Sequence, residues 1–105
     1  MKNREIAELF DRIADALEIK GETGFKVVAY RKASRILQDM TEDVAKVAAE
    51  GRLEALPGIG EGLAGKIDEY VRTGRMAKYA EVMAGVPETL LGLLEIRGLG
   101  GKTVH

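Results

Sequence analysis

The chain has 105 residues, of which 46% are hydrophobic and 31% are charged, and it contains no cysteine. This composition is typical of one folded domain and excludes a disulfide scaffold or a thiolate metal site. Its apolar runs are far shorter than the roughly 20 residues that cross a bilayer, so no membrane contact is expected. No apolar signal segment follows the polar first residues, so we expect a location in the cytoplasm. We also expect the chain to be a monomer.

The charge is nearly balanced overall but unevenly distributed. Sixteen basic and seventeen acidic residues give a net charge of −1, whereas most nucleic-acid-binding modules are clearly basic. Residues 20–36, however, hold five basic side chains and one acidic one, a local charge of +4. A domain with one basic side can meet a phosphate backbone while its acidic side faces solvent. The charge pattern permits DNA binding without demonstrating it.

Helical spacing of apolar residues dominates the first forty positions. The first stripe predicts a helix that Asn3 caps and that ends before Gly21; its members are Ile6, Leu9, Phe10, Ile13 and Leu17. A second helix is expected over residues 25–40, after Gly24. The side chains expected to face inward on it are Phe25, Ala29, Ala33, Ile36 and Leu37.

The remaining elements are also predicted to be helical. Thr41 is the expected N-cap of a third helix that Gly51 closes, and residues 56–62 form a compact glycine-rich turn. The apolar stripe of a fourth helix, which ends at Gly74, consists of Leu63, Ile67, Tyr70 and Val71. A short helix is expected at about residues 75–84, and Pro87 introduces a last one at residues 89–96.

No segment shows the alternation of a strand, so the predicted fold is all-α: a compact four-helix domain with a helix-hairpin-helix motif, plus the start of a second such motif. The second motif is inferred from an internal repeat: LEALPGIG at residues 53–60 is matched by LEIRGLG at residues 94–100. We therefore assign residues 1–85 to the first domain and residues 86–105 to a truncated second subdomain.

The glycine turn between two helices has a specific physical use. Glycine has no Cβ atom, so another molecule can approach its backbone closely. The first N–H groups of the following helix have no intrahelical acceptor and lie at the positive end of the helix dipole. Gly58, Gly60 and Gly62 are thus candidates to present donors to a phosphate oxygen, while Ile59 is expected to point into the core. The alternative is a helix connection that uses glycine for geometry alone.

The motifs together resemble the N-terminal domain of family X DNA polymerases. They are LPGIG at residues 56–60, LAGKIDEY at residues 63–70, TG at residues 73–74 and AYRKA at residues 29–33. The resemblance spans nearly the whole chain. It implies a domain that binds the 5′-phosphate side of gapped or nicked DNA in base excision repair, continuous with a polymerase region that this chain lacks.

The resemblance also implies roles for single residues. Lys66 matches the lysine that attacks an abasic sugar as a 5′-deoxyribose phosphate lyase, and Lys78 is a reserve nucleophile. A lysine on the edge of an apolar stripe has an ordinary alternative, in which it covers apolar surface or pairs with Glu69. The positions implied to contact DNA are Lys26, Tyr30, Lys32 and Phe25. Tyr30 and Phe25 could equally be core residues.

Two differences from the family weaken the lyase interpretation. Gly62 and Glu54 stand where the vertebrate pattern has phosphate-facing lysines. The resemblance requires no cofactor, but it implies a monovalent cation, Na⁺ or K⁺, on the backbone carbonyls of Glu54, Leu56 and Ile59. The second motif would hold another through Leu94, Ile96 and Leu99. A non-catalytic helical domain that binds DNA or a protein remains the alternative.

Overall fold

The computed structural model describes residues 2–22 and 24–84, so the predicted second subdomain lies outside the described residues. Within these ranges the chain forms helices and no strand, which confirms the all-α prediction. The elements are α1 (Asn3–Ile19), α2 (Phe25–Asp39), α3 (Val44–Ala49), the 3₁₀ helix η1 (Leu53–Ala55), α4 (Glu61–Thr73) and α5 (Ala77–Ala84). The domain boundary near residue 85 stays a prediction.

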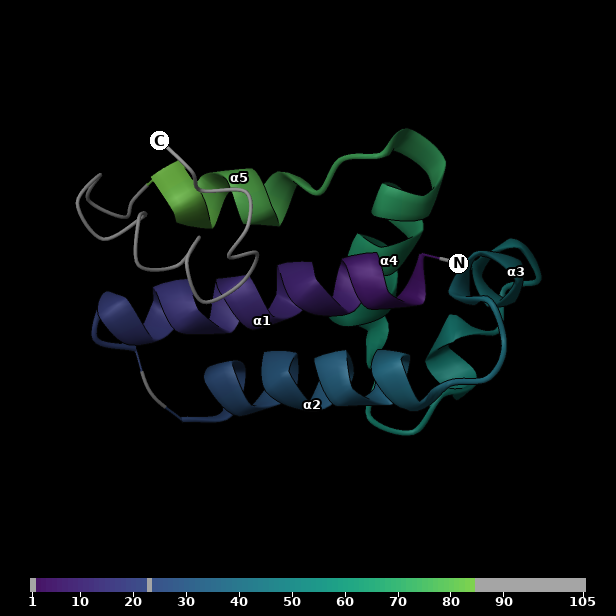
Figure 1. Cartoon of the computed structure of the whole chain (residues 1–105), viewed down its shortest axis with the longest axis horizontal. Helices are drawn as coiled ribbons and strands as arrows, with labels where there is room; N and C mark the ends of the chain where they lie inside the picture. Colours follow the sequence, from purple (N-terminus) through teal and green to yellow (C-terminus); the bar gives the residue numbers. More distant parts are fainter. Residues whose placement is uncertain (1, 23, 85–105) are drawn as a thin grey trace.

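Helix α1 is the centre of the fold. It runs beside α2 along the long axis, with α5 on its other side and α4 crossing it (Figure 1). The two long helices meet through Phe10 and Tyr30, whose rings pack edge to face with their centroids 5.5 Å apart. The largest fully buried side chains of the core are Phe10, Ile6, Ile13, Leu37 and Ile67. Apolar burial of this kind is the main force that holds such a bundle together.

The start of α1 differs from the prediction. Lys2 is the N-cap, and Asn3 is the first helical residue with its side chain 4% exposed. The Asn3 side chain donates to the Glu42 carbonyl at 2.8 Å and accepts from the Val44 amide at 2.9 Å. Asn3 therefore joins α1 to the beginning of α3 and satisfies two backbone groups that burial would otherwise leave unpaired.

The cap of α3 is also two residues later than expected. Asp43, rather than Thr41, precedes the helix with extended backbone, and its carboxylate accepts from the Ala45 amide at 3.0 Å. The helix ends, as predicted, just before Gly51. A carboxylate at this position satisfies a free amide and interacts favourably with the helix dipole.

The inward face of α2 is rotated from the predicted one. Phe25 is 81% exposed, so the expectation that it packs in the core is wrong. The buried stripe is Val27, Tyr30, Ala33, Ser34 and Leu37. Because successive helical residues turn by about 100°, Phe25 lies roughly 200° from Val27 and points away from α1.

Candidate nucleic-acid interface

The glycine turn connects η1 to α4 in a hairpin. Its backbone is closed by a hydrogen bond from the Ile59 amide to the Leu56 carbonyl, 3.0 Å long, and by one from the Ala64 amide to the Gly60 carbonyl, 2.9 Å long. Ile59 is 3% exposed, which confirms that it points into the core. Ile59 thus anchors the turn in the core, and Leu56 packs partly buried against the same core.

The outward side of the hairpin is open at Gly60 and Gly62. A Cβ atom built on either glycine would meet no atom within 4 Å. The first amides of α4 have no intrahelical acceptor, as at the start of any helix. Gly60 is the N-cap of α4 and has no side chain that could accept from them. Gly60 also has an ordinary negative φ of −86°, so the fold does not require glycine here. This geometry suits close approach of an anion to the helix N-terminus.

Gly58 has a different surrounding, because it lies against α2. Its φ is +93°, and a Cβ atom there would come within 2.6 Å of Ile36 Cδ1 and 3.8 Å of Lys32 Cε. The stem of Lys32 therefore lies beside the hairpin, although the two are 26 positions apart in sequence. The tertiary structure brings a cation from α2 next to the candidate phosphate site.

Lys66 lies one turn into α4 and is half-buried. Its Nζ atom donates to the Gly62 carbonyl at 3.4 Å, so the ammonium is directed back towards the hairpin. The Glu69 carboxylate has another role, since it accepts from the Ala77 amide at 3.0 Å at the start of α5. No ion pair of Lys66 with an acidic side chain occurs among the residues that the structure describes.

The other residues implied by the resemblance are not all in one place. Lys26 and Phe25 are exposed on the first turn of α2. Tyr30 is 7% exposed, and burial together with the charge of Glu81 raises the pKa of its hydroxyl. Lys78 belongs to α5, which lies on the side of α1 away from α2 (Figure 1). Tyr30 is thus a core residue, and Lys78 is on a different element from the hairpin.

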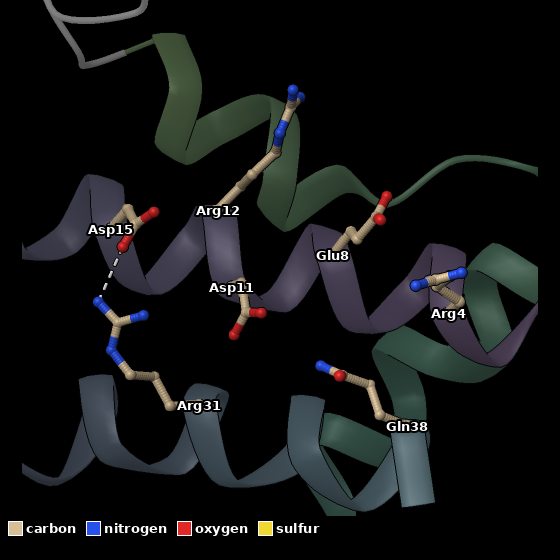
Figure 2. Close-up of a pocket in the computed structure, with 7 residues that line it drawn as sticks. All are labelled: Arg4, Glu8, Asp11, Arg12, Asp15, Arg31 and Gln38. Carbon is tan, nitrogen blue, oxygen red and sulfur yellow. Dashed lines mark hydrogen bonds and ion pairs between the residues drawn. The ribbon is translucent and has the colours of Figure 1, made fainter. Parts of the chain in front are cut away.

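Arg31 belongs to the basic stretch but does not contribute a free charge to the interface. Its guanidinium lies 2.8 Å from Asp15 and 2.7 Å from Glu18 on α1. Figure 2 shows the first of these contacts across the seam between the two helices. The basic surface of α2 therefore rests on Lys26, Lys32 and Arg35, which are exposed.

A polar cavity of about 370 Å³ lies in this seam (Figure 2). Its lining side chains are Arg4, Glu8, Asp11, Arg12, Asp15, Arg31 and Gln38. Arginines and carboxylates occur there in equal number, so the cavity has no net positive charge to attract a phosphate. We do not place the nucleic-acid interface here.

The side of the hairpin away from α2 is acidic. A cavity of about 360 Å³ between α3, η1 and α4 is lined in part by Glu54, Glu61 and Asp68. Asp68 is paired with Arg72 at 2.8 Å, while the two glutamates add negative charge close to the turn. Like charges repel, so a phosphate would approach the hairpin from the Lys32 side.

Comparisons with known proteins agree with this geometry. A family model described as a helix-hairpin-helix domain matches residues 1–76, which include the whole turn and α4. The chain belongs to this helix-hairpin-helix family. The match covers η1, the glycine turn and α4.

The chain is also similar to a curated protein, the DNA polymerase/3'-5' exonuclease PolX of Bacillus subtilis (strain 168). The two are 36% identical over 104 residues, which are 99% of this chain and 18% of that protein. The resemblance to the N-terminal domain of family X DNA polymerases is thereby confirmed. This helix-hairpin-helix domain spans about a fifth of the length of that relative. No helix in the described ranges is long and apolar enough to cross a membrane.

Proposed function

We propose that this helix-hairpin-helix domain binds DNA by its backbone, with a phosphate oxygen held at the N-terminus of α4. The observation that carries the proposal is the open backbone at Gly60 and Gly62, in a hairpin whose Gly58 lies beside the side chain of Lys32. Backbone amides and a lysine contact phosphate without reading bases. The domain would therefore position DNA without selecting a sequence.

The DNA we propose is a gapped or nicked duplex, bound at the 5′-phosphate of the strand beyond the gap. A terminal phosphate carries more negative charge than an internal one and suits a helix N-terminus flanked by Lys32 and Lys66. The PolX relative is named a DNA polymerase. By this likeness the domain would hold the far side of a gap for polymerase chemistry performed elsewhere in a longer protein.

Binding of gapped DNA by the Gly60→Val variant tests this proposal. A branched side chain at this position blocks close approach and should cost at least one charge-assisted hydrogen bond, about tenfold in affinity. Because a Cβ atom at residue 60 meets no atom of the fold within 4 Å, the valine variant should unfold at the wild-type urea concentration, which is the control for folding. Unchanged affinity of the valine variant for 5′-phosphorylated gapped DNA would contradict phosphate binding at the hairpin.

A lyase activity through Lys66 is the finer part of the proposal. The amine would attack C1′ of the abasic sugar and expel water to form an imine. Loss of a C2′ proton would then break the C3′–O bond and release the strand with its 5′-phosphate. The amine must be deprotonated to attack, and the Gly62 carbonyl already orients Nζ towards the hairpin.

Sodium borohydride trapping with an incised 5′-abasic DNA substrate tests the lyase. A covalent adduct that Lys66→Ala abolishes would support it, and Lys78→Ala should leave that adduct in place. An adduct that persists in Lys66→Ala and disappears in Lys78→Ala would transfer the role to Lys78. Absence of any adduct, with gapped DNA still bound, would leave a domain that only positions DNA.

The hairpin carbonyls could also hold Na⁺ or K⁺ beside the phosphate. The Leu56 carbonyl accepts one hydrogen bond, from the Ile59 amide, and a carbonyl oxygen has a second lone pair for a cation. Glu54 belongs to the exposed part of η1 and Ile59 precedes the cap of α4. Dependence of affinity on the choice of K⁺, Na⁺ or a bulky organic cation at equal ionic strength would test this role.

Protein binding is the alternative function for the same fold. Phosphate contacts release counterions, so DNA affinity through the hairpin should fall steeply and linearly in logarithmic plots against salt. Binding of a protein partner does not require this steep dependence of affinity on salt. Weak binding of DNA that does not change with salt would favour the protein-interaction alternative.

A further inference from the structure

Helix α1 carries two acidic pairs with the same spacing along its seam with α2. Asp15 and Glu18 form one pair, and Arg31 of α2 contacts both, with its Nη2 atom 2.8 Å from Asp15 and 2.7 Å from Glu18. Glu8 and Asp11 form the other pair, seven residues earlier. Seven residues are almost two turns of a helix, so the two pairs lie on one face. The contacts of Arg31 therefore show how such a pair holds a guanidinium group.

The earlier pair has no cation of its own. Glu8 and Asp11 are partly buried, and neither forms an ion pair with any residue that the structure describes. Helix α2 runs antiparallel to α1 (Figure 1), so the residue seven positions after Arg31 lies opposite this pair. That residue is Gln38, which is neutral and donates to the Ser34 hydroxyl at 3.0 Å.

The polar cavity of about 370 Å³ lies at this place in the seam. Figure 2 shows that Asp11 and Gln38 point into the space between the two helices, while Glu8 lies at its rim on the side of α5. Arg12 also lines the cavity but extends towards α5, where it donates to the Tyr79 hydroxyl at 2.6 Å. A carboxylate and a side-chain amide thus face an open space that the neighbouring arginine does not fill.

A second cavity continues the first one towards the start of α1. It has a volume of about 300 Å³, and its lining residues are Asn3, Arg4, Leu37, Gln38 and Met40. Arg4 and Gln38 line both cavities, so the two form one groove with an apolar end at Leu37 and Met40. From Asn3 to Asp15 the groove follows α1 for about 18 Å, the length of about five extended residues. This length suits a peptide better than a single small cation.

We propose that the groove binds an extended segment of a partner protein and that an arginine of this segment lies between Asp11 and Gln38. Its guanidinium has five N–H donors in one plane, so it can bond the Asp11 carboxylate and the side-chain oxygen of Gln38 together. Rotation of the Glu8 side chain inward adds the second carboxylate, as Glu18 does for Arg31. An apolar residue beside the arginine contacts the apolar end of the groove.

The groove and the hairpin can be occupied at the same time. Lys32, beside the hairpin, and Gln38, in the groove, are six positions apart on α2. Six positions correspond to roughly 120° around a helix, so the groove opens on a different side of α2 from the hairpin. The inference goes beyond the proposed function and does not depend on DNA binding.

Binding of a capped pentapeptide, followed by NMR of the chain, tests the groove. The probe is Ala-Leu-Arg-Leu-Ala; one control replaces arginine by citrulline, which keeps the shape without the charge, and another replaces both leucines by alanine. The probe should bind with a Kd of about 1 mM at low salt and shift the amide resonances of α1 around Asp11. The citrulline peptide should bind about tenfold more weakly and the alanine peptide about threefold more weakly. Asp11→Asn should reduce the affinity for the probe to that for the citrulline peptide.

A substitution within the chain tests the same place without a ligand. Gln38→Arg puts a guanidinium opposite the unpaired carboxylates, so it should block the pentapeptide and lower the equilibrium constant of unfolding by about two- to fivefold. Gln38→Met also loses the bond to Ser34 and is therefore the matched control. The gain in stability should disappear when Asp11→Asn is present as well.

The possible results either support this assignment or overturn it. Equal affinity for the arginine and citrulline peptides, or Gln38→Arg no more stable than Gln38→Met, would overturn it. Methylguanidinium bound as tightly as the pentapeptide would assign the groove to small free cations, and self-association that Asp11→Asn abolishes would assign it to a second copy of the chain. Asp11→Asn should leave the affinity for 5′-phosphorylated gapped DNA within about twofold, so the groove and the proposed function can fail separately.

Discussion

A Cβ atom on Gly58 would lie 2.6 Å from the Cδ1 atom of Ile36, so a side chain at residue 58 would displace the end of the Ile36 side chain on α2. The backbone of Gly58 also has a φ of +93°, which side chains of L-residues rarely allow. Gly58→Ala should therefore lower the free energy of unfolding by about 1–3 kcal/mol. Urea unfolding measures this loss directly.

Two further variants separate the causes at Gly58. Ile36→Val removes the Cδ1 atom, so in that background Gly58→Ala should cost less, by the part that the steric contact contributes. Gly65→Ala introduces a Cβ atom within helix α4, where nothing lies within 4 Å, and should stabilise the domain by about 0.5–1 kcal/mol. Equal effects of alanine at residues 58 and 65 would contradict this account.

The second prediction concerns Asn3, whose side chain bridges the Glu42 carbonyl and the Val44 amide. Asn3→Ala leaves two backbone groups without this partner and should cost about 2–3 kcal/mol in urea unfolding. Asp43→Ala removes only the cap of the short helix α3 and should cost about 1 kcal/mol. If the two variants are equally stable, the bridge does not contribute as the buried geometry indicates.

The third prediction separates two adjacent basic residues. Arg31→Gln breaks the contacts with Asp15 and Glu18 across the helix seam and should lower stability by about 1–2 kcal/mol while leaving DNA affinity within about twofold. Lys32→Ala should do the reverse, because Lys32 lies beside the hairpin. Urea unfolding and DNA titration of both variants measure the stability and the DNA affinity of each. A large loss of DNA affinity in Arg31→Gln would mean that the seam opens in the complex.

The fourth prediction concerns alkaline pH. The Tyr70 hydroxyl donates a hydrogen bond to the carboxylate of Glu5. Burial is the larger cause and this hydrogen bond the smaller one, and together they raise the pKa of Tyr70 to about 12. The ammonium of Lys2 lies over the same ring, 5.8 Å from its centroid. Since the ordinary pKa of tyrosine is about 10, the folded state binds the proton more tightly than the unfolded chain. Tyr70 therefore stabilises the fold fully below about pH 10 and loses this contribution as the pH rises towards 12.

Urea unfolding between pH 8 and pH 12 tests the contribution of Tyr70. Tyr70→Phe should show a smaller fall in stability over this range than the wild type. Glu5→Gln, which keeps an acceptor without its charge, should be intermediate. A residual fall is expected in Tyr70→Phe, because burial also raises the pKa of Tyr30. Identical profiles for the wild type and Tyr70→Phe would rule out this source of pH dependence.

The sequence by itself determined the helices, the glycine hairpin and the inward position of Ile59. These features are local, because apolar spacing sets which stripe of a helix can be buried and glycine sets where the chain can turn. The family likeness depends on the same local residues. Caps were predicted less well, since Asn, Thr and Asp near a helix start are chemically similar candidates and only the final geometry selects one.

Only the tertiary structure decided how α2 is rotated about its own axis. That rotation placed Phe25 outside, turned Arg31 into the seam with α1 and brought Lys32 beside Gly58. A stripe pattern leaves this angle uncertain by about one residue, or roughly 100°. Contacts between residues far apart in sequence depend on this angle, because the rotation of a helix decides which neighbouring element each of its side chains contacts.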